Sequence, residues 1–177
     1  MIYYEKELKK DYKFKGNIIN LRVDTIELPD GKAATREIVE HSGGVGVAAI
    51  DKDGKIYLVR QYRRPIDRDL LEIPAGKLDK GEDHRLGAVR ELKEETGLTA
   101  GKLIYLSATE PSPGYTNEII HLYLALDLTR GEAEPDEGEF LNVETYSLNQ
   151  ALEMIKNGEI TDGKTINAIL IAKEYLK

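Results

Sequence analysis

The sequence contains, from Gly76 to Leu98, the run GKLDKGEDHRLGAVRELKEETGL. This run begins as a glycine-containing loop, and its later residues have the composition of a short helix. Either Asp83 or Glu82 can cap the N-terminus of the helix, where acidic side chains interact favourably with the helix dipole. Gly97 can end it, because glycine readily adopts the left-handed conformation of a C-cap. The run therefore predicts a loop that leads into a short helix.

Three glutamates of this helix are crowded onto two turns. Glu91 and Glu95 are four residues apart, so their Cβ atoms lie on one face at roughly 5–6 Å, and Glu94 flanks the same face. Acidic side chains on helices are most often solvated, and like charges at this spacing destabilise a helix. Here, however, they follow a loop that exposes its backbone, in a chain without cysteine. Hard divalent cations such as Mg²⁺ or Mn²⁺ prefer such oxygen ligands, so the pattern favours a metal site.

The run resembles the Nudix box, a motif with glycine, glutamate and arginine at fixed spacings. Every fixed position is met, by Gly76, Glu82, Arg90, Glu91, Leu92, Glu94, Glu95, Gly97 and Leu98. Seven of these positions require one residue type, and seven such matches coincide by chance on the order of 10⁻⁸ times per start position. The resemblance implies hydrolysis of a nucleoside diphosphate linked to another group. It also implies an α/β fold, the Nudix-type α/β/α sandwich with a mixed sheet.

Segments outside the box are similar to those of one subgroup, the ADP-ribose pyrophosphatases. They are Arg36–Val39, Val59–Arg63, Leu71–Gly76 and Ser112–Gly114. Pro113, sixteen residues after Gly97, matches the proline that marks the subgroup. The chain departs from the family at Gly87, where an alanine is usual; this lowers helix propensity slightly and touches no expected ligand. The resemblance implies Mg²⁺-dependent hydrolysis of ADP-ribose to AMP and ribose 5-phosphate, with Mn²⁺ as an alternative ion.

The resemblance assigns metal ligands and catalytic residues by position. The implied metal ligands are Glu91, Glu95, Glu94 and the carbonyl of Ala75. Arg90 is expected to fix the rotamer of a box glutamate. Glu82 is expected to be either an acid that lies behind the ligands or an outer ligand itself. The subgroup's general base lies on a later loop, where Glu139 aligns best and Glu137 is the alternative. The implied catalytic set is therefore Glu139, Glu137, Glu94 and Arg90.

The positions similar to substrate-binding residues are Arg36, Arg63, Glu72, Pro113 and Gly114. The forked guanidinium of arginine matches the geometry of phosphate. A basic strand end, such as Arg60 to Arg68, can equally be a solvated sheet edge. The loop around Pro113 is expected to be rigid, since proline fixes φ.

The whole chain has the size of one domain. We expect a unit of strands over residues 1–41 and a Nudix domain over 42–177. Strands are expected at 17–28 and 35–41, forming a hairpin, and at 45–50, 55–63, 103–108, 119–128 and 141–146, with helices at 148–156 and 165–176 capped by Ser147 and Asp162. N-terminal strands of this kind are similar to those exchanged between protomers in the family, which implies a homodimer.

Composition excludes several classes of function. The net charge of −7 argues against a broad nucleic-acid-binding surface. The absence of cysteine excludes thiol nucleophiles, disulfides and cysteine-zinc sites, and fits a cytoplasmic location. No apolar run approaches the ~20 residues of a membrane span. The three histidines show no metal-ligand spacing, and His84 is expected to face solvent in the first turn of the box helix.

Two alternatives to ADP-ribose hydrolysis stay open. One is another Nudix substrate, such as a different ADP-sugar, a dinucleotide, a flavin or an oxidised nucleotide. The other is a sensor that binds ADP-ribose without cleaving it. A sensor would be expected to have lost box glutamates, whereas this chain retains Glu82, Glu91, Glu94 and Glu95.

Overall fold

The computed structural model describes residues 2–135 and 138–176. Their contacts form two compact units. One comprises Met1–Gly43 and Glu110–Ile119, and the other comprises Gly44–Thr109 and Ile120–Lys177. The loop that carries Pro113 therefore groups with the N-terminal strands, which the sequence did not indicate.

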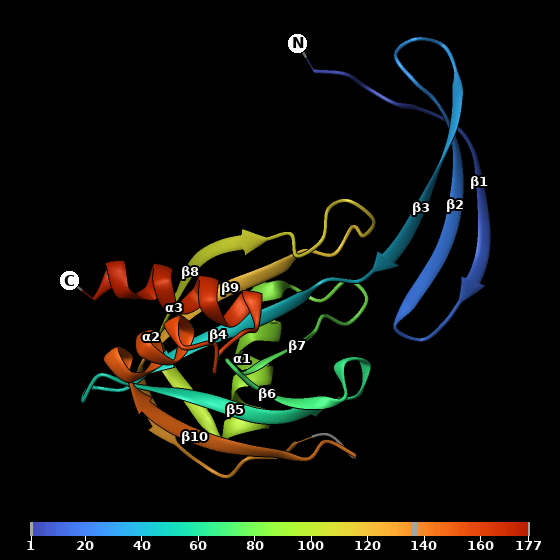
Figure 1. The fold of residues 1–177 in the computed structure, drawn as a ribbon. Coiled ribbons are helices and arrows are strands. Elements are labelled where there is room, and N and C mark those ends of the chain that lie inside the picture. The colour runs from blue at the N-terminus through green and yellow to red at the C-terminus, as the bar shows by residue number, and fades with distance from the viewer. Residues whose placement is uncertain (1, 136–137, 177) are drawn as a thin grey trace. The chain divides into compact units, whose positions relative to one another are not determined.

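The N-terminal unit is a three-stranded antiparallel sheet in the order β1-β2-β3 (Figure 1). The strands are Lys6–Lys15 (β1), Ile19–Glu27 (β2) and Ala33–His41 (β3). The β2–β3 hairpin agrees with the predicted one, and Gly31 takes the positive φ of 82° that its turn requires. The 110–119 loop is fastened to β3, because Val39 N–H donates to the Tyr115 carbonyl at 2.8 Å.

The second unit is built on a mixed sheet in the order β10-β5-β4-β9-β8, in which β6 pairs with β5 and β7 with β4. Strands β4 and β9 are parallel, and the other pairs are antiparallel. The strands are Gly44–Ile50 (β4), Lys55–Arg63 (β5), Arg68–Glu72 (β6), Ala75–Lys77 (β7), Leu98–Thr109 (β8), Ile120–Arg130 (β9) and Leu141–Ser147 (β10); a 3₁₀ turn, Arg64–Ile66, precedes β6.

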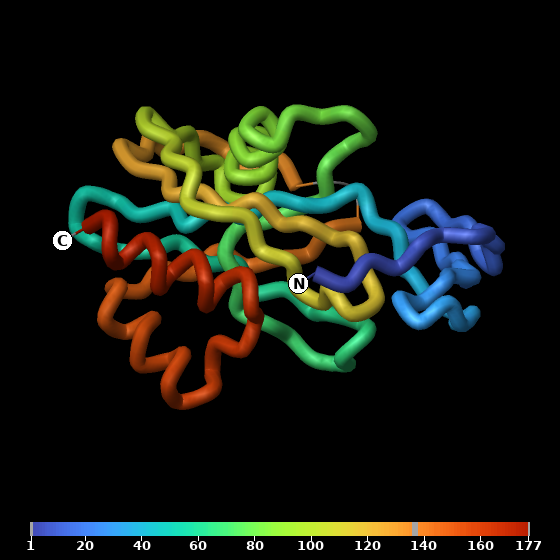
Figure 2. Tube along the Cα trace, turned by 90° about the horizontal axis from the view of Figure 1, so that it is seen from above, coloured from blue at the N-terminus to red at the C-terminus, as the bar shows by residue number. Residues whose placement is uncertain are grey.

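Helices cover both faces of this sheet. Figure 2 shows α1 (His84–Thr96) on one face, and α2 (Leu148–Lys156) and α3 (Gly163–Tyr175) on the other. Strand β4 is buried on both faces, as its unbroken apolar sequence predicts. Val45 and Val47 belong to the core under α1, whereas Ala48 and Ile50 belong to the core under α2 and α3. The predicted α/β/α sandwich with a mixed sheet is confirmed.

The helix ends follow the predicted capping residues. Asp83, rather than Glu82, caps α1 and accepts from Arg85 N at 2.9 Å. Gly97 ends α1 with φ +69°, and Ser147 and Asp162 cap α2 and α3. No helix in the described residues is long and apolar enough to cross a membrane.

One local expectation was incomplete. The sequence indicated only a glycine-containing loop from Gly76 onward, yet Ala75–Lys77 forms strand β7 along β4. Gly44 allows this close pairing, since a β-carbon there would lie 3.0 Å from the Gly76 carbonyl oxygen. Strand β7 therefore leads the chain into the box loop from the edge of the central sheet.

Candidate functional site

The last turn of α1 lies against the start of β7. Glu95 is buried, with 2% of its surface exposed. Its Oε2 accepts a hydrogen bond from Ala75 N–H at 2.9 Å. The structure therefore brings together two predicted metal-ligating residues, Ala75 and Glu95, which are twenty positions apart.

Glu91 occupies the space beside Gly76. A β-carbon at Gly76 would lie 2.0 Å from Oε1 of Glu91, far inside van der Waals contact. The φ of Gly76 is not positive, so the conformation of its backbone does not require glycine. The absence of a β-carbon at Gly76 leaves room for the carboxylate of Glu91.

Arg90 holds three box carboxylates. It donates from Nε and Nη2 to Glu82 at 3.0 Å each, and from Nη1 to Glu91 at 2.7 Å and Glu94 at 2.9 Å. Glu82 in turn accepts from Asp79 N–H at 2.9 Å, which ties the box loop to the helix. Arg90 thus contacts Glu82 and Glu94 as well as Glu91. Its role in fixing the rotamer of a box glutamate stays a prediction.

Negative charge is poorly compensated at the two buried glutamates. Burial raises the pKa of Glu95 to about 8; the Ala75 N–H opposes this, and Glu91 and Glu139 add to it. Burial also raises the pKa of Glu91, with Arg90 opposing and the charges of Glu94 and Glu139 adding. A bound cation would relieve both effects.

The donor chemistry fits a hard divalent cation, because every candidate ligand is an oxygen. Gly76 supplies the space in which the carboxylate of Glu91 lies. Among the described residues, no three acidic or histidine side chains are already arranged to enclose an ion. Arg90 contacts Glu91 and Glu94, and Ala75 N–H contacts Glu95. Each of these contacts uses one oxygen of its carboxylate, so the other oxygen of Glu91, Glu94 and Glu95 could bind an ion while the contact stays in place.

An ion pair between a half-buried arginine and a buried glutamate lies where β5 meets β6. Arg63 donates to both oxygens of Glu72, from Nε at 2.7 Å and from Nη2 at 2.9 Å. Glu72 is 1% exposed and also pairs with Lys164 of α3. Burial opposes its charge, but Arg63 and Lys164 outweigh burial and lower the pKa of Glu72. Arg63 also acts electrostatically on Glu95, so this pair belongs to the surroundings of the box.

The acidic loop after β9 is attached at its start to the end of α1. Gly131 N–H donates to the Gly97 carbonyl at 2.7 Å, and Glu134 N–H to the Glu94 carbonyl at 2.9 Å. Glu139 is exposed, and its charge acts on both Glu91 and Glu95. The alternative base, Glu137, lies outside the described residues.

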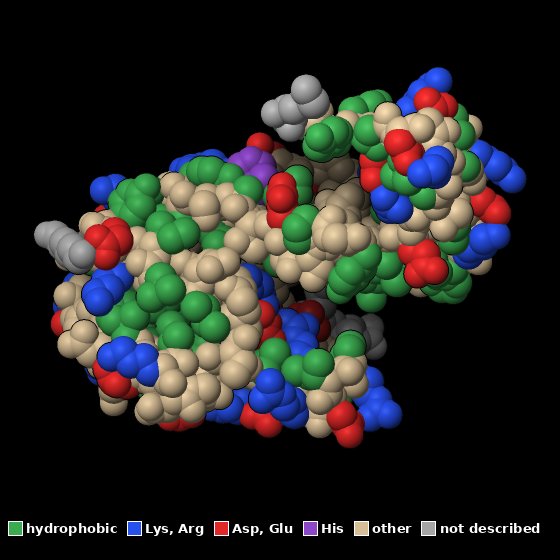
Figure 3. Space-filling model, turned by 45° about the horizontal axis from the view of Figure 1, so that its top comes forward, with side chains coloured by type: hydrophobic (Ala, Val, Ile, Leu, Met, Phe, Trp, Pro, Cys, Tyr) green, Lys and Arg blue, Asp and Glu red, His purple; other side chains and the backbone are tan. Residues whose placement is uncertain are grey.

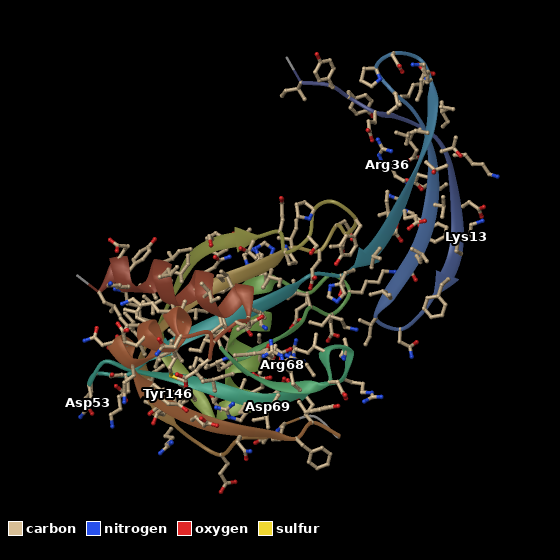
Figure 4. The ribbon with its side chains drawn as sticks, in the orientation of Figure 1. Lys13, Arg36, Asp53, Arg68, Asp69 and Tyr146 are labelled. Atoms are coloured by element: carbon tan, nitrogen blue, oxygen red, sulfur yellow. The ribbon has the colours of Figure 1, made fainter. Side chains whose placement is uncertain are left out.

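Three predicted substrate residues lie in the N-terminal unit. Arg36 stands on β3 (Figure 4), where it forms an ion pair with Glu5 and donates to the Thr35 carbonyl at 3.0 Å. Pro113 and Gly114 form a turn in which the Ser112 carbonyl accepts from Tyr115 N–H at 3.1 Å. Their substrate contacts stay predictions.

The expectation that His84 faces solvent was wrong. Its Nδ1 lies 2.5 Å from the hydroxyl of Tyr123, and its ring stacks on His121 at 4.0 Å between centroids. Tyr123 is buried under α1, and a buried phenol needs a hydrogen-bond partner. His84 supplies that partner and so attaches the start of the box helix to β9.

Comparisons with known proteins identify the family of this chain. The family model for the NUDIX domain matches residues 32–169. The chain belongs to the NUDIX family. A second family model, the nucleoside diphosphate sugar hydrolase N-terminal domain, matches residues 5–39. The family membership predicted from the box is confirmed.

Several relatives of this NUDIX protein match along most of its length. An ADP-ribose pyrophosphatase of Bacillus subtilis (strain 168) is 47% identical, over 98% of this chain and 96% of that protein. A protein named methanol dehydrogenase activator, of Bacillus methanolicus, is 45% identical, over 99% and 94%. An ADP-ribose pyrophosphatase of Mycobacterium tuberculosis is 39% identical, over 88% and 76%.

A solved structure shares the NUDIX fold of this chain. The crystal structure of an ADP compounds hydrolase superposes with a TM-score of 0.86, covering 97% of this chain and 94% of the other. The two sequences are 23% identical, so the likeness concerns the fold alone.

Proposed function

We propose that this NUDIX protein hydrolyses the pyrophosphate of ADP-ribose to AMP and ribose 5-phosphate. The observation that carries the proposal is the complete box, with Glu95 against Ala75 and Glu91 against Gly76. The names of the relatives at 47% and 39% identity support ADP-ribose as the substrate.

The box residues would hold the ions that this reaction needs. Glu91, Glu95, Glu94 and the Ala75 carbonyl are the proposed ligands for Mg²⁺, with Mn²⁺ as an alternative. Such an ion offsets phosphate charge and lowers the pKa of water. Arg90 keeps Glu91 and Glu94 beside one another. The guanidinium of Arg63, which Glu72 orients, would contact the anionic substrate.

Glu139 is the proposed general base, whose carboxylate takes a proton from the attacking water. The water oxygen bonds to one phosphorus of the P–O–P anhydride as the bond from that phosphorus to the bridging oxygen breaks. Both products, AMP and ribose 5-phosphate, leave as phosphate monoesters. We expect Glu139→Gln to lower kcat about 10²-fold, within the range that general bases contribute. Steady-state rates of AMP release measure this.

Two matched variants test the choice of base. Glu132→Gln removes a charge from the same loop. It should leave kcat within about twofold of the wild-type value, because the side chain of Glu132 is solvated. Glu137→Gln tests the alternative. If Glu137→Gln loses activity and Glu139→Gln retains it, the roles are reversed.

A substrate panel tests the reaction itself. The purified protein is incubated with ADP-ribose, other ADP-sugars, a dinucleotide, a flavin nucleotide and an oxidised nucleoside triphosphate, each with Mg²⁺, Mn²⁺ or EDTA. We expect ADP-ribose to give the highest kcat/KM, AMP as product, and no turnover in EDTA. Preference for another compound would support a different NUDIX substrate, and tight binding of ADP-ribose without turnover would support a sensor.

A second candidate function comes from the relative named methanol dehydrogenase activator, which is 45% identical over nearly the whole chain. We propose testing whether this protein raises the rate of a purified methanol dehydrogenase. Glu95→Gln is the matched control, because it removes hydrolysis and retains the surface. Activation by both forms would separate the two functions.

A homodimer formed through the N-terminal sheet is also proposed. Large apolar side chains on and beside β1 are 41–65% exposed, namely Leu8, Tyr12, Phe14 and Ile18. Figure 3 shows hydrophobic side chains at the surface of this unit among charged ones. Contact with a second copy of this sheet would cover these exposed apolar side chains.

Light scattering tests the dimer. We expect a mass of twice the chain's 19.9 kDa at micromolar concentration. Phe14→Asp should shift the protein toward the monomer, because it would place a charge in the apolar contact. A monomeric wild-type protein would contradict the proposal.

A further inference from the structure

Each residue from Glu72 to Ala75, immediately before the box, is fixed by a different partner. The Glu72 carboxylate pairs with Arg63 and Lys164, Ile73 N–H donates to Thr165, the Pro74 carbonyl accepts from Val47, and Ala75 N–H donates to Glu95. Two of these partners, Lys164 and Thr165, belong to the first turn of α3. That turn is more than sixty residues from any predicted metal ligand in the sequence.

Thr165 is a buried bridge between α3 and the segment before the box. Its Oγ1 accepts from Ile73 N–H at 2.8 Å and donates to Oδ2 of Asp162 at 2.6 Å. Thr165 and Ile73 are both fully buried, at 0% exposure. Water cannot replace the hydroxyl there, so Ile73 N–H would be left unsatisfied without it.

Lys164 also holds the buried carboxylate of Glu72, at an oxygen that Arg63 contacts too. Its Nζ pairs with Oε2 of Glu72 and lies 3.0 Å from Oδ2 of Asp162. Arg63 uses its Nε and Nη2 on the same carboxylate. Removing Lys164 would leave Arg63 as the remaining cation on Glu72, so the carboxylate and the guanidinium would both reorient.

We propose that Lys164 and Thr165 are positioning residues for the hydrolysis. Lys164 acts through Glu72 on the orientation of Arg63, and Thr165 acts through Ile73 on the contact between Ala75 and Glu95. This inference rests on the proposed function, in which Arg63 binds substrate and Glu95 holds metal.

The two residues should affect different kinetic parameters. Lys164→Met keeps the aliphatic stem and removes the amine, and we expect KM for ADP-ribose to rise about tenfold with kcat nearly unchanged, since Arg63 contributes to binding. Thr165→Val keeps the shape and removes the hydroxyl. We expect kcat to fall about tenfold with KM nearly unchanged, because misplaced catalytic groups slow the chemical step.

Conservative variants and a remote control accompany the test. Lys164→Arg and Thr165→Ser retain the charge and the hydroxyl, and should recover most of the lost KM or kcat. Lys173→Met makes the same chemical change as Lys164→Met in the exposed last turn of α3, and should change neither parameter. In an Arg63→Gln background, Lys164→Met should raise KM no further, because its effect passes through Arg63.

Two measurements do not depend on turnover. Calorimetry in EDTA should show that Lys164→Met raises the Kd for ADP-ribose by the same factor as its KM. Amide hydrogen exchange should be faster at Ile73 in Thr165→Val and unchanged in Thr165→Ser. If Thr165→Val fails to fold, Thr165→Cys, which keeps the size and a weak acceptor, carries the same test.

The outcomes separate this inference from the proposed function. If wild-type protein does not hydrolyse ADP-ribose, the proposed function fails, while calorimetry and Ile73 exchange still test the positioning roles. If wild-type protein hydrolyses ADP-ribose and Lys164→Met changes only the melting temperature, its role is structural and the inference is overturned. Equal effects of Lys164→Met and Lys173→Met would overturn it as well.

Discussion

Glu95→Gln is expected to lower kcat for ADP-ribose by at least about 10³-fold, which corresponds to about 4 kcal/mol of barrier. Glu95 is the most buried of the proposed ligands and lies against Ala75. Glutamine keeps the size of the side chain and an oxygen that can accept from Ala75 N–H, but it has no charge to hold a divalent ion. AMP release over a range of Mg²⁺ concentrations measures the loss.

The same variant should fold at least as well as the wild type. Burial raises the pKa of Glu95 from its ordinary value of 4.5 to about 8, so the metal-free folded state resists its ionisation. The wild type therefore loses stability relative to Glu95→Gln as the pH rises from about 4.5 to 8, and the difference is constant above that range. Melting temperatures in EDTA at pH 4.5 and 8.5 measure this.

The result would contradict the metal assignment if Glu95→Gln hydrolysed ADP-ribose at the wild-type rate. A variant that neither folds nor binds metal would test nothing, which is why the melting experiment accompanies the kinetics. Glu153→Gln, on an exposed face of α2, is the matched control and should change neither property.

The parts of the fold that the sequence predicted are those that local physics determines. Asp83 and Gly97 bound the box helix because a capping carboxylate and a left-handed glycine act within a few residues. The apolar run of β4 indicates burial on both faces wherever the strand lies in the sheet. The box itself could be identified because its spacing is fixed by one helix and the loop before it.

The contacts that the sequence did not predict join residues far apart in the chain. Lys164 and Glu72 are separated by 92 positions, and His84 and Tyr123 by 39. Neither lysine nor histidine had a distinguishing pattern around it, since the partner in each case is supplied by the sheet topology. A buried tyrosine or glutamate in a predicted strand is the available signal, because each requires a polar partner that the strand cannot provide.

The roles assigned to the two box glycines lead to a pair of opposite expectations. Gly76→Ala should lower kcat about 10³-fold, because its β-carbon would meet the Glu91 carboxylate at 2.0 Å and displace that proposed ligand. The displaced atoms are the far end of a flexible side chain, and Gly76 has no positive φ. We therefore expect a stability change under about 1 kcal/mol.

Gly97→Ala should have the opposite effect, with a large loss of stability and a small loss of kcat. Alanine at φ +69° is strained, and its β-carbon would lie 2.6 Å from the carbonyl oxygen of Gly131, which is backbone and cannot swing away. We expect a loss of about 2–3 kcal/mol and a melting temperature lower by roughly 5–10 °C. Below that temperature, kcat should fall far less than in Gly76→Ala, since the carboxylate of Glu91 keeps its place.

Kinetics and thermal unfolding of the two variants, measured side by side, decide whether the first glycine of the box serves the site or the fold. Both substitutions add one methyl group to the same motif, so a general sensitivity of the motif would affect them alike. An active Gly76→Ala would mean that Glu91 works from another position than the one it occupies beside β7. The space that Gly76 leaves for the Glu91 carboxylate would then not explain why this position is glycine.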